Sequence, residues 1–149
     1  MKMAISPTLR SDDGIVVFTD GSASYKDRSG GWGWIALDNF DTEVTGSGSE
    51  SDTTVNRMEL TAAIEALTTL YDTCGSSDIL IYSDSEYVVL GSRDPGRARR
   101  KNIDLWNELD EAIELHEYVE WNHVRGHTDS YYNDVADRLA GEARREGIS

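Results

Sequence analysis

The chain has 149 residues, a length that fits a single compact domain. Acidic residues outnumber basic ones 28 to 14, giving a formal net charge of −14, which is opposite to the balance expected of a protein that binds nucleic acid through charge alone. The single cysteine, Cys74, cannot form an internal disulfide, and no Cys/His cluster has zinc-ligand spacing. These features favour a reducing, cytoplasmic location and exclude a disulfide-stabilised secreted domain.

The beginning of the chain carries no targeting signal in its composition. Residues 1–14 mix charged and small side chains without a long apolar run, so they match neither a signal peptide nor a membrane anchor. We predict that 1–14 is a flexible leader and that 15–149 is one domain, with no membrane association.

Three strands are predicted at the start of that domain. Residues 15–20 form a short β-branched run that ends in an aspartate and a glycine, which is typical of a buried strand followed by a turn. Residues 30–37 and 42–49 are predicted as two further strands, and the turn residues between them favour an antiparallel meander.

Helical and strand patterns alternate in the remainder. Apolar residues recur at helical spacing from Thr54 until Gly75 ends the pattern, and Thr53, Thr54 or Asn56 could cap this helix. A strand at 79–83 follows and could run parallel to the first strand.

The last third of the chain continues this alternation. Asn102 is predicted to cap a helix that reaches His116, and a short strand at 119–123 and a helix at 133–146 follow. This order predicts an α/β fold with a mixed sheet. The tryptophans are assigned to the core, namely Trp32, Trp34, Trp106 and Trp121.

Four acidic residues stand where local structure would place them near a ligand. Asp20 and Asp84 each end an apolar strand, and ligands of α/β sheets bind beyond the carboxyl ends of the strands. Glu59 and Asp137 lie at the edges of apolar helical stripes. Taken singly, each has an ordinary explanation as a turn residue or as a favourable charge near a helix end.

Convergence of the four carboxylates would change that interpretation. Their mutual repulsion in a partly dry cleft would require protons or divalent metal ions, and hard oxygen ligands favour Mg²⁺. Two such ions about 4 Å apart could hold a phosphodiester between them. His127 lies in a polar loop at 126–130, which does not favour a core role, and it could also be a plain exposed histidine.

Six motifs, in order and spanning about 15–145, together resemble ribonuclease H of the type 1 class. They are Phe18-Thr19-Asp20-Gly21-Ser22 with Gly30-Gly31-Trp32-Gly33; Asn56-Arg57-Met58-Glu59-Leu60 with Ala62-Ala63; Ser83-Asp84-Ser85; Asn102-Ile103-Asp104-Leu105-Trp106; Val124-Arg125-Gly126-His127; and Asp137-Arg138-Leu139-Ala140.

The resemblance implies a five-stranded mixed sheet flanked by helices and an endoribonuclease that hydrolyses the RNA strand of RNA/DNA hybrids. It implies two Mg²⁺ ions, with Mn²⁺ as a possible substitute, and products with 3′-hydroxyl and 5′-phosphate ends. Asp20 would bridge both ions, Asp137 would help hold the ion on the nucleophile side, and Glu59 and Asp84 the other. His127 would assist proton movement or product release.

The resemblance also implies the contacts with the hybrid. Backbone atoms near Gly21, Ser22 and Ala23, together with Asn56, would lie near the hybrid, while Thr54 and Arg57 resemble contacts to DNA-strand phosphates. A short basic segment within 91–101 is expected to hold the DNA strand through Arg97, Arg99, Arg100 and Lys101. The residues at Lys26, Val55 and Glu86 depart from the family pattern. We expect these departures to change substrate binding and cleavage-site preference, and not the metal chemistry.

Two alternative functions remain open. One is a hybrid-binding module without catalysis, and the other is a related nuclease of the resolvase or strand-transfer type. A monomer without an obligate protein partner is the default expectation. The strong acidity separately suggests a protein adapted to high salt, where an acidic surface stays hydrated.

Overall fold

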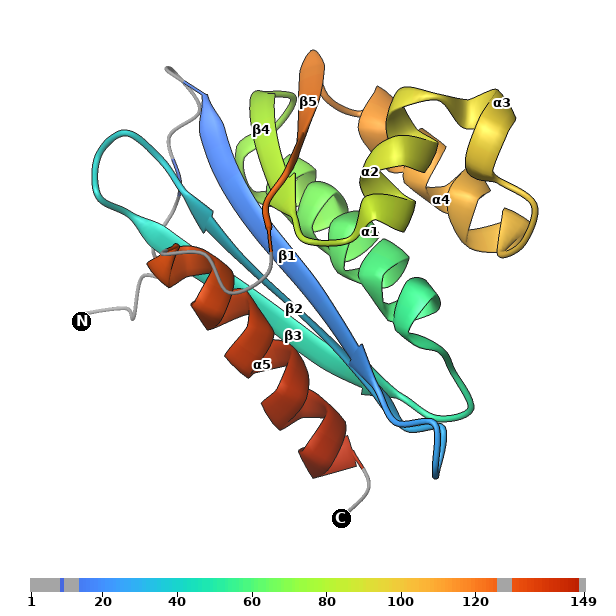
Figure 1. Ribbon diagram of the computed structural model, residues 1–149. Helices are drawn as coiled ribbons and strands as arrows, with labels where there is room; N and C mark the ends of the chain where they lie inside the picture. The colour runs from blue at the N-terminus through green and yellow to red at the C-terminus, as the bar shows by residue number, and fades with distance from the viewer. Residues whose placement is uncertain (1–8, 10–13, 126–129, 148–149) are drawn as a thin grey trace.

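The computed structural model describes residues 9, 14–125 and 130–147, and these residues form one mixed sheet with helices on both faces (Figure 1). The strands are β1 (Ile15–Ala23), β2 (Gly30–Leu37), β3 (Glu43–Glu50), β4 (Asp78–Ser83) and β5 (Tyr118–His123). The helices are α1 (Val55–Cys74), α2 (Glu86–Arg93), α3 (Pro95–Ala98), α4 (Ile103–Glu114) and α5 (Tyr131–Gly147). The predicted five-stranded mixed sheet is confirmed, in the order β3-β2-β1-β4-β5.

The pairing of β1 decides where the functional residues lie. β1 is antiparallel to β2 and parallel to β4, and β4 is parallel to β5. In the β1–β4 register, Thr19 pairs with Ser83. The next residue after each member of this pair is an aspartate. Asp20 and Asp84 therefore lie side by side where β4 ends, as predicted.

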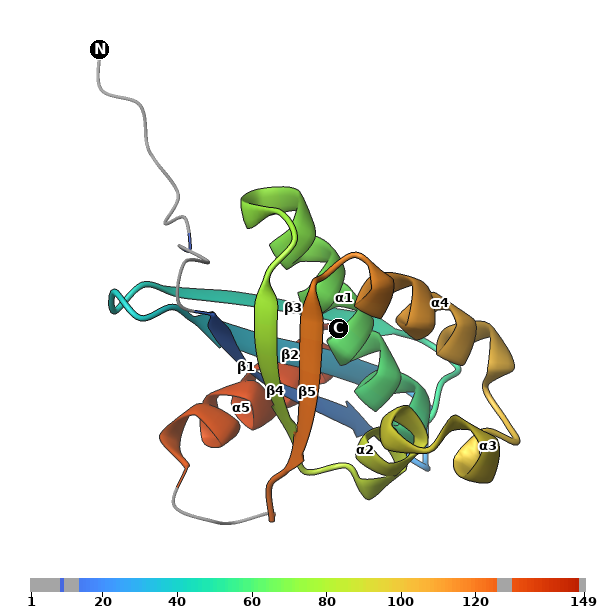
Figure 2. The same cartoon turned by 90° about the horizontal axis from the view of Figure 1, so that it is seen from above.

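The helices form two layers around the sheet. In Figures 1 and 2, α1 and α4 lie on one face and α5 lies on the other, beside β1, β2 and β3. Glycines in β2 allow α5 to approach closely: a Cβ atom at Gly33 would lie only 2.8 Å from the Ala140 backbone nitrogen. This close packing sets the position of Asp137 on α5.

Helix α1 begins and ends as its sequence predicts. Thr54 is the N-cap, and its side chain accepts a hydrogen bond from the Arg57 backbone N–H. At the other end, Gly75 adopts a φ of 77° and donates its N–H to the Tyr71 carbonyl. The choice among three candidate caps is thereby settled in favour of Thr54.

The core lies between the sheet and the α1–α4 layer. Trp34, Trp106 and Trp121 are buried as predicted, whereas Trp32 is half-buried and packs against the core from its edge. Leu9, which falls within the predicted leader, is buried against the same core. Residues 1–8 and 10–13 of that leader lie outside the described part of the chain.

Several sequence predictions need correction. No helix was predicted between Asp84 and Asn102, but α2 and α3 lie there, and Ser85 caps α2 by accepting a hydrogen bond from the Val88 N–H. Asn102 precedes α4 as predicted, yet it has a left-handed φ of 59° and makes no side-chain cap bond. Its amide instead binds side chains of neighbouring helices, which explains the departure.

Other boundaries differ by a few residues. β1 continues to Ala23 because it pairs with β2 along its whole length, and α5 starts at Tyr131, two residues earlier than predicted. His116 lies beyond the end of α4 and is buried, with Nδ1 accepting the Ser77 N–H and Nε2 2.8 Å from the Leu67 carbonyl oxygen. Within the described residues, none of the helices has the length and apolarity needed to cross a bilayer.

Candidate active site

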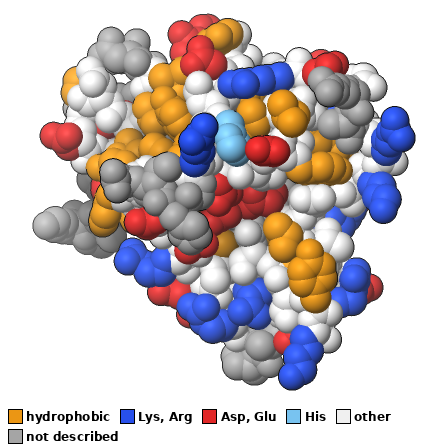
Figure 3. Space-filling model, viewed as in Figure 1, with side chains coloured by type: hydrophobic (Ala, Val, Ile, Leu, Met, Phe, Trp, Pro, Cys, Tyr) orange, Lys and Arg blue, Asp and Glu red, His pale blue; other side chains and the backbone are white. Residues whose placement is uncertain are grey.

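Three of the four predicted carboxylates meet where β4 ends, beside β1. Asp20 comes from β1, Asp84 follows β4, and Glu59 projects from α1. One carboxylate oxygen from each lies within 4.8 Å of the others. Figure 3 shows the acidic side chains gathered at the centre of this face, with Lys and Arg side chains spaced around them.

The approach of α1 to β1 at Gly21 brings Glu59 into this group. The Gly21 N–H donates to Asp20 Oδ1 at 2.8 Å and also to Glu59 Oε1. A Cβ atom at Gly21 would lie 2.6 Å from the Met58 carbonyl carbon, so a larger residue would push the helix away. Gly21 therefore permits the convergence from within β1, and the turn predicted at this glycine is absent because the strand continues to Ala23.

The three carboxyl groups resist ionisation when no cation is present. Burial raises the pKa of Asp20 to about 8, and the charges of Asp84 and Asp137 add to this rise. Burial and the adjacent Asp20 charge raise the pKa of Glu59 well above its ordinary value. Burial also raises the pKa of Asp84. The fold thus places acids where positive charge is required to keep them all ionised.

Asp137 reaches the group from the opposite face of the sheet. It is exposed on α5, outside the tight set of three, but it lies close enough to Asp20 to raise the Asp20 pKa by a side-chain hydrogen bond and by its charge. All four predicted acids therefore share one neighbourhood, with three in contact and the fourth beside them.

An open cleft of about 330 Å³ adjoins the carboxylates. Asn56 and Val55 line it from the start of α1, and Ser85, Glu86 and Tyr87 line it from the start of α2. Among the residues expected to contact substrate, Gly21 and Asn56 line the cleft. The hydroxyl of Thr54 is occupied by capping, and Gly21, Ser22 and Ala23 form the half-buried end of β1.

The donor set suits a hard divalent cation. Three carboxylates with oxygens within 4.8 Å of one another offer the oxygen ligands that Mg²⁺ and Mn²⁺ prefer. Among the described residues, this set includes no sulfur or imidazole ligand of the kind that would select softer metals. The open side of the cleft leaves room for a phosphate and water. This arrangement can bind metal and polarise a phosphodiester.

Two of the arginines expected to hold the DNA strand are engaged within the protein. Arg57 donates two hydrogen bonds to Asp104, at 3.1 and 2.8 Å, and a third to Asn102. Arg99 pairs with Asp110 at 2.6 Å and lies 4.4 Å above the Trp106 ring.

The other cations of the basic segment differ from these two. Arg100 and Lys101 are exposed and form no ion pair among the described residues. The side chain of Arg97 lies outside the described part, as does His127. Arg100 and Lys101 are therefore the members of the segment that face solvent.

Sequence reasoning missed a polar network that joins α1, α2 and α4. The Tyr87 hydroxyl accepts bonds from Asn102 Nδ2 at 3.1 Å and Trp106 Nε1 at 3.0 Å, and it donates to the Lys101 carbonyl. Because Tyr87 lines the cleft, this network fixes one wall of the site. The only signal in the sequence was Asn102 before a helix, which predicted capping instead.

Comparisons with known proteins identify the family. The family model described as RNase H matches residues 12–145. Ribonuclease H of Acetivibrio thermocellus is 39% identical over 140 residues, covering 85% of this chain and 91% of that protein. The crystal structure of LC9-RNase H1, a type 1 RNase H with the type 2 active-site motif, is 27% identical with a TM-score of 0.78 over 96% of this chain and 75% of that one.

A third comparison concerns a complex. LC11-RNase H1, whose crystal structure contains an RNA/DNA hybrid, shares the fold with a TM-score of 0.78 at 23% identity, over 91% of this chain and 99% of that one. The family match spans most of the chain, and the acids converge at the sheet edge. On both grounds, this chain belongs to the ribonuclease H family.

Proposed function

We propose that this protein is an endoribonuclease that hydrolyses the RNA strand of RNA/DNA hybrids. The observation that carries the proposal is the convergence of Asp20, Glu59 and Asp84, with Asp137 beside them, at the open edge of the sheet of a ribonuclease H family member. The relatives named ribonuclease H and the hybrid-bound neighbour support the same substrate.

The carboxylates are proposed to hold two Mg²⁺ ions, with Mn²⁺ as a substitute. When bound, such ions supply an activated water as nucleophile and stabilise the oxygen that leaves the phosphodiester, so that 3′-hydroxyl and 5′-phosphate ends result. Asp20 is central to the set because its pKa responds to each of the other three acids. Asp137 is proposed to act on the nucleophile side, and Glu59 and Asp84 on the leaving-group side.

His127 is proposed to move a proton during turnover or to assist product release. The proposal rests on the resemblance of its motif, since the residue lies outside the described part of the chain. Of the described histidines, His116 is held in the core by two backbone groups, and His123 has Nε2 3.3 Å from the Asp84 carbonyl oxygen.

The DNA strand is proposed to lie along the start of α1 and the basic segment, while Gly21, Ser22, Ala23 and Asn56 face the RNA strand. Asn56 lines the cleft beside Glu59. Because Arg99 is bound to Asp110, the contacts from this segment are assigned chiefly to Arg100 and Lys101, with Arg97 as a third candidate. Thr54 and Arg57, at the start of α1, are proposed to lie beside phosphates of the DNA strand.

We also propose that the enzyme works as a cytoplasmic monomer. The single cysteine is half-buried and hydrogen-bonded to the Leu70 carbonyl, which fits a reducing compartment. A catalytically inactive hybrid-binding module is the competing function. It is disfavoured because Asp20 and Glu59 are buried side by side and burial raises the pKa of both, an unfavourable arrangement that a binding surface does not need.

The test is cleavage of a labelled RNA/DNA hybrid beside single-stranded RNA, double-stranded RNA and double-stranded DNA. Each substrate is incubated with Mg²⁺, with Mn²⁺ and with chelator. We expect cutting of the hybrid's RNA strand alone, and only with a divalent ion. Hybrid binding without cleavage would replace the proposal with the binding module, and cutting of double-stranded DNA would favour a resolvase-type nuclease.

A further inference from the structure

A second pocket, of about 280 Å³, lies beside the catalytic cleft. It is lined by Glu86, Val89, Leu90, Arg93 and His123, and thus lies between α2 and the end of β5. These two elements run side by side in both ribbon views (Figures 1 and 2). Glu86 lines the catalytic cleft as well, and His123 Nε2 is 3.3 Å from the Asp84 carbonyl oxygen. The pocket therefore continues the cleft away from α1.

The pocket differs from the cleft in the charge it presents. Arg28, Arg57 and Arg99 each pair with an aspartate, whereas no ion pair among the described residues includes Arg93. The guanidinium of Arg93 donates instead to the Trp121 carbonyl. The pocket is therefore lined by one carboxylate, Glu86, and by the guanidinium of Arg93, which forms no ion pair with Glu86 or with any other described acid.

The pocket also has an apolar floor. Val89 is buried beneath it, and Leu90 remains 54% exposed although it is a large aliphatic side chain. A cation and an imidazole beside an apolar surface match a nucleotide unit, in which a phosphate adjoins a sugar and a base. Inorganic phosphate alone would leave Leu90 without a partner.

We propose that this pocket is a nucleotide subsite for the RNA strand, next to the phosphate that is cut. Arg93 and His123 contact the backbone phosphate, and Leu90 packs against the sugar or base. The assignment rests on the proposed function, because the scissile phosphate must lie at the carboxylates and the same strand then continues past Asp84 into the pocket.

Arg93 also has a structural role, so it is a poor probe. β5 is an edge strand of the sheet, and the bond from Arg93 to the Trp121 carbonyl covers part of that edge. Replacing Arg93 would disturb both folding and binding. Leu90 is the sharper probe because a charged side chain at this exposed helical position leaves the core untouched.

The experiment compares Leu90→Lys and Leu90→Glu with Tyr118→Lys and Tyr118→Glu. Tyr118 is 55% exposed at the opposite end of β5, so the control pair adds the same charges at matched exposure away from the pocket. We expect Leu90→Lys to lower the KM for hybrid about 3- to 10-fold and Leu90→Glu to raise it similarly, with kcat nearly unchanged. The slope of log KM against log salt concentration should become about one unit steeper for Leu90→Lys and about one unit shallower for Leu90→Glu.

A series of hybrids shortened by one nucleotide at a time from either RNA end locates the contact. The difference between the two Leu90 variants should disappear at the step that removes the nucleotide in the pocket. Equal KM shifts from the Leu90 and Tyr118 pairs would overturn the subsite while leaving the proposed function intact. Wild-type protein that binds hybrid but does not cut it would overturn the proposed function, and the subsite is then judged by hybrid affinity in the same four variants.

Discussion

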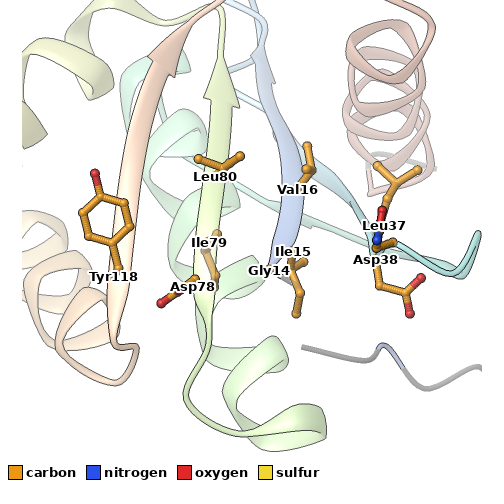
Figure 4. A pocket seen from close by; sticks show the side chains of 10 residues that line it. Gly14, Ile15, Val16, Leu37, Asp38, Asp78, Ile79, Leu80 and Tyr118 are labelled. Atoms are coloured by element: carbon orange, nitrogen blue, oxygen red, sulfur yellow. The ribbon is translucent and has the colours of Figure 1, made fainter. Parts of the chain in front are cut away.

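The two ends of the parallel strands carry cavities of nearly equal volume and opposite character. Where β4 ends, beside Asp20 within β1, the catalytic cleft measures about 330 Å³ and is bordered by Asp20, Glu59 and Asp84. At the other ends of these strands, a cavity of about 320 Å³ is lined mainly by aliphatic side chains, with Asp38 and Asp78 at its rim (Figure 4).

The difference shows what turns an acid at a strand end into a site residue. Asp78 is exposed where β4 begins, and it belongs to no set of converging carboxylates among the described residues. Asp84 follows the same strand six residues later, but α1 and β1 bring two further buried acids to it. Convergence and burial together, rather than negative charge, distinguish the two ends.

Neutralising one aspartate at each end of β4 should affect the two ends very differently. Asp84→Asn should reduce hybrid cleavage by about 10³-fold or more, since metal stabilisation of the reaction is worth several kcal/mol. Asp78→Asn should leave cleavage unchanged. Single-turnover rates in Mg²⁺ measure both, and equal losses from the two variants would refute the assignment of the site to one end.

A second prediction tests whether the carboxylates act alone. His127→Ala should slow turnover by about 10²-fold without abolishing it, the range expected for loss of a group that assists proton transfer. Multiple-turnover and single-turnover rates with hybrid separate an effect on product release from one on chemistry. His123→Ala is the comparison: because His123 belongs to the proposed RNA subsite, its loss should raise KM with little change in kcat. A larger loss of kcat from it than from His127→Ala would reverse their roles.

The raised pKa values predict how stability depends on pH when divalent ions are removed. Because the pKa of Asp20 is raised in the folded state, to about 8, the folded protein binds more protons than the unfolded chain between about pH 4 and 8. The free energy of unfolding should therefore fall as pH rises through this window.

Denaturant unfolding in chelator at pH 5 and pH 8.5 measures this change. Asp20→Asn should flatten the dependence, and Mg²⁺ should restore stability to the wild type at the higher pH through preferential binding to the folded state. Unfolding energies that rise with pH in chelator would contradict the unfavourable clustering of the three acids.

The smallest expected effect comes from the ion pair beside the cleft. Hydrogen bonds from Arg57 hold the pKa of Asp104 at about 2. Asp104→Asn should free the Arg57 guanidinium, so we expect a modest decrease in KM for hybrid, about 2- to 3-fold, with a slight loss of stability. Arg28→Gln, which breaks a similar pair with Asp52, is the comparison for general surface charge.

The sequence predicted the strands and helix that carry the carboxylates better than it predicted the α2–α3 region and the start of α4. Short apolar runs predicted β1 and β4, and apolar residues at helical spacing predicted α1. The parallel pairing of β1 and β4 then placed Asp20 and Asp84 together. The α2–α3 region was missed because charged residues at 93–101 obscured its short helical pattern. The left-handed Asn102 depends on tertiary partners such as Tyr87 and Arg57, and local propensity carries no information about them.

The most direct test of the central claim is single-turnover cleavage of a hybrid labelled at the RNA 5′ end, comparing wild type with Asp20→Asn. We expect a metal-dependent ladder of RNA fragments from the wild type, loss of the ladder in chelator, and no measurable cleavage by the folded Asp20→Asn variant. A folded Asp20→Asn protein that cuts the hybrid at the wild-type rate would contradict the assignment of catalysis to these carboxylates.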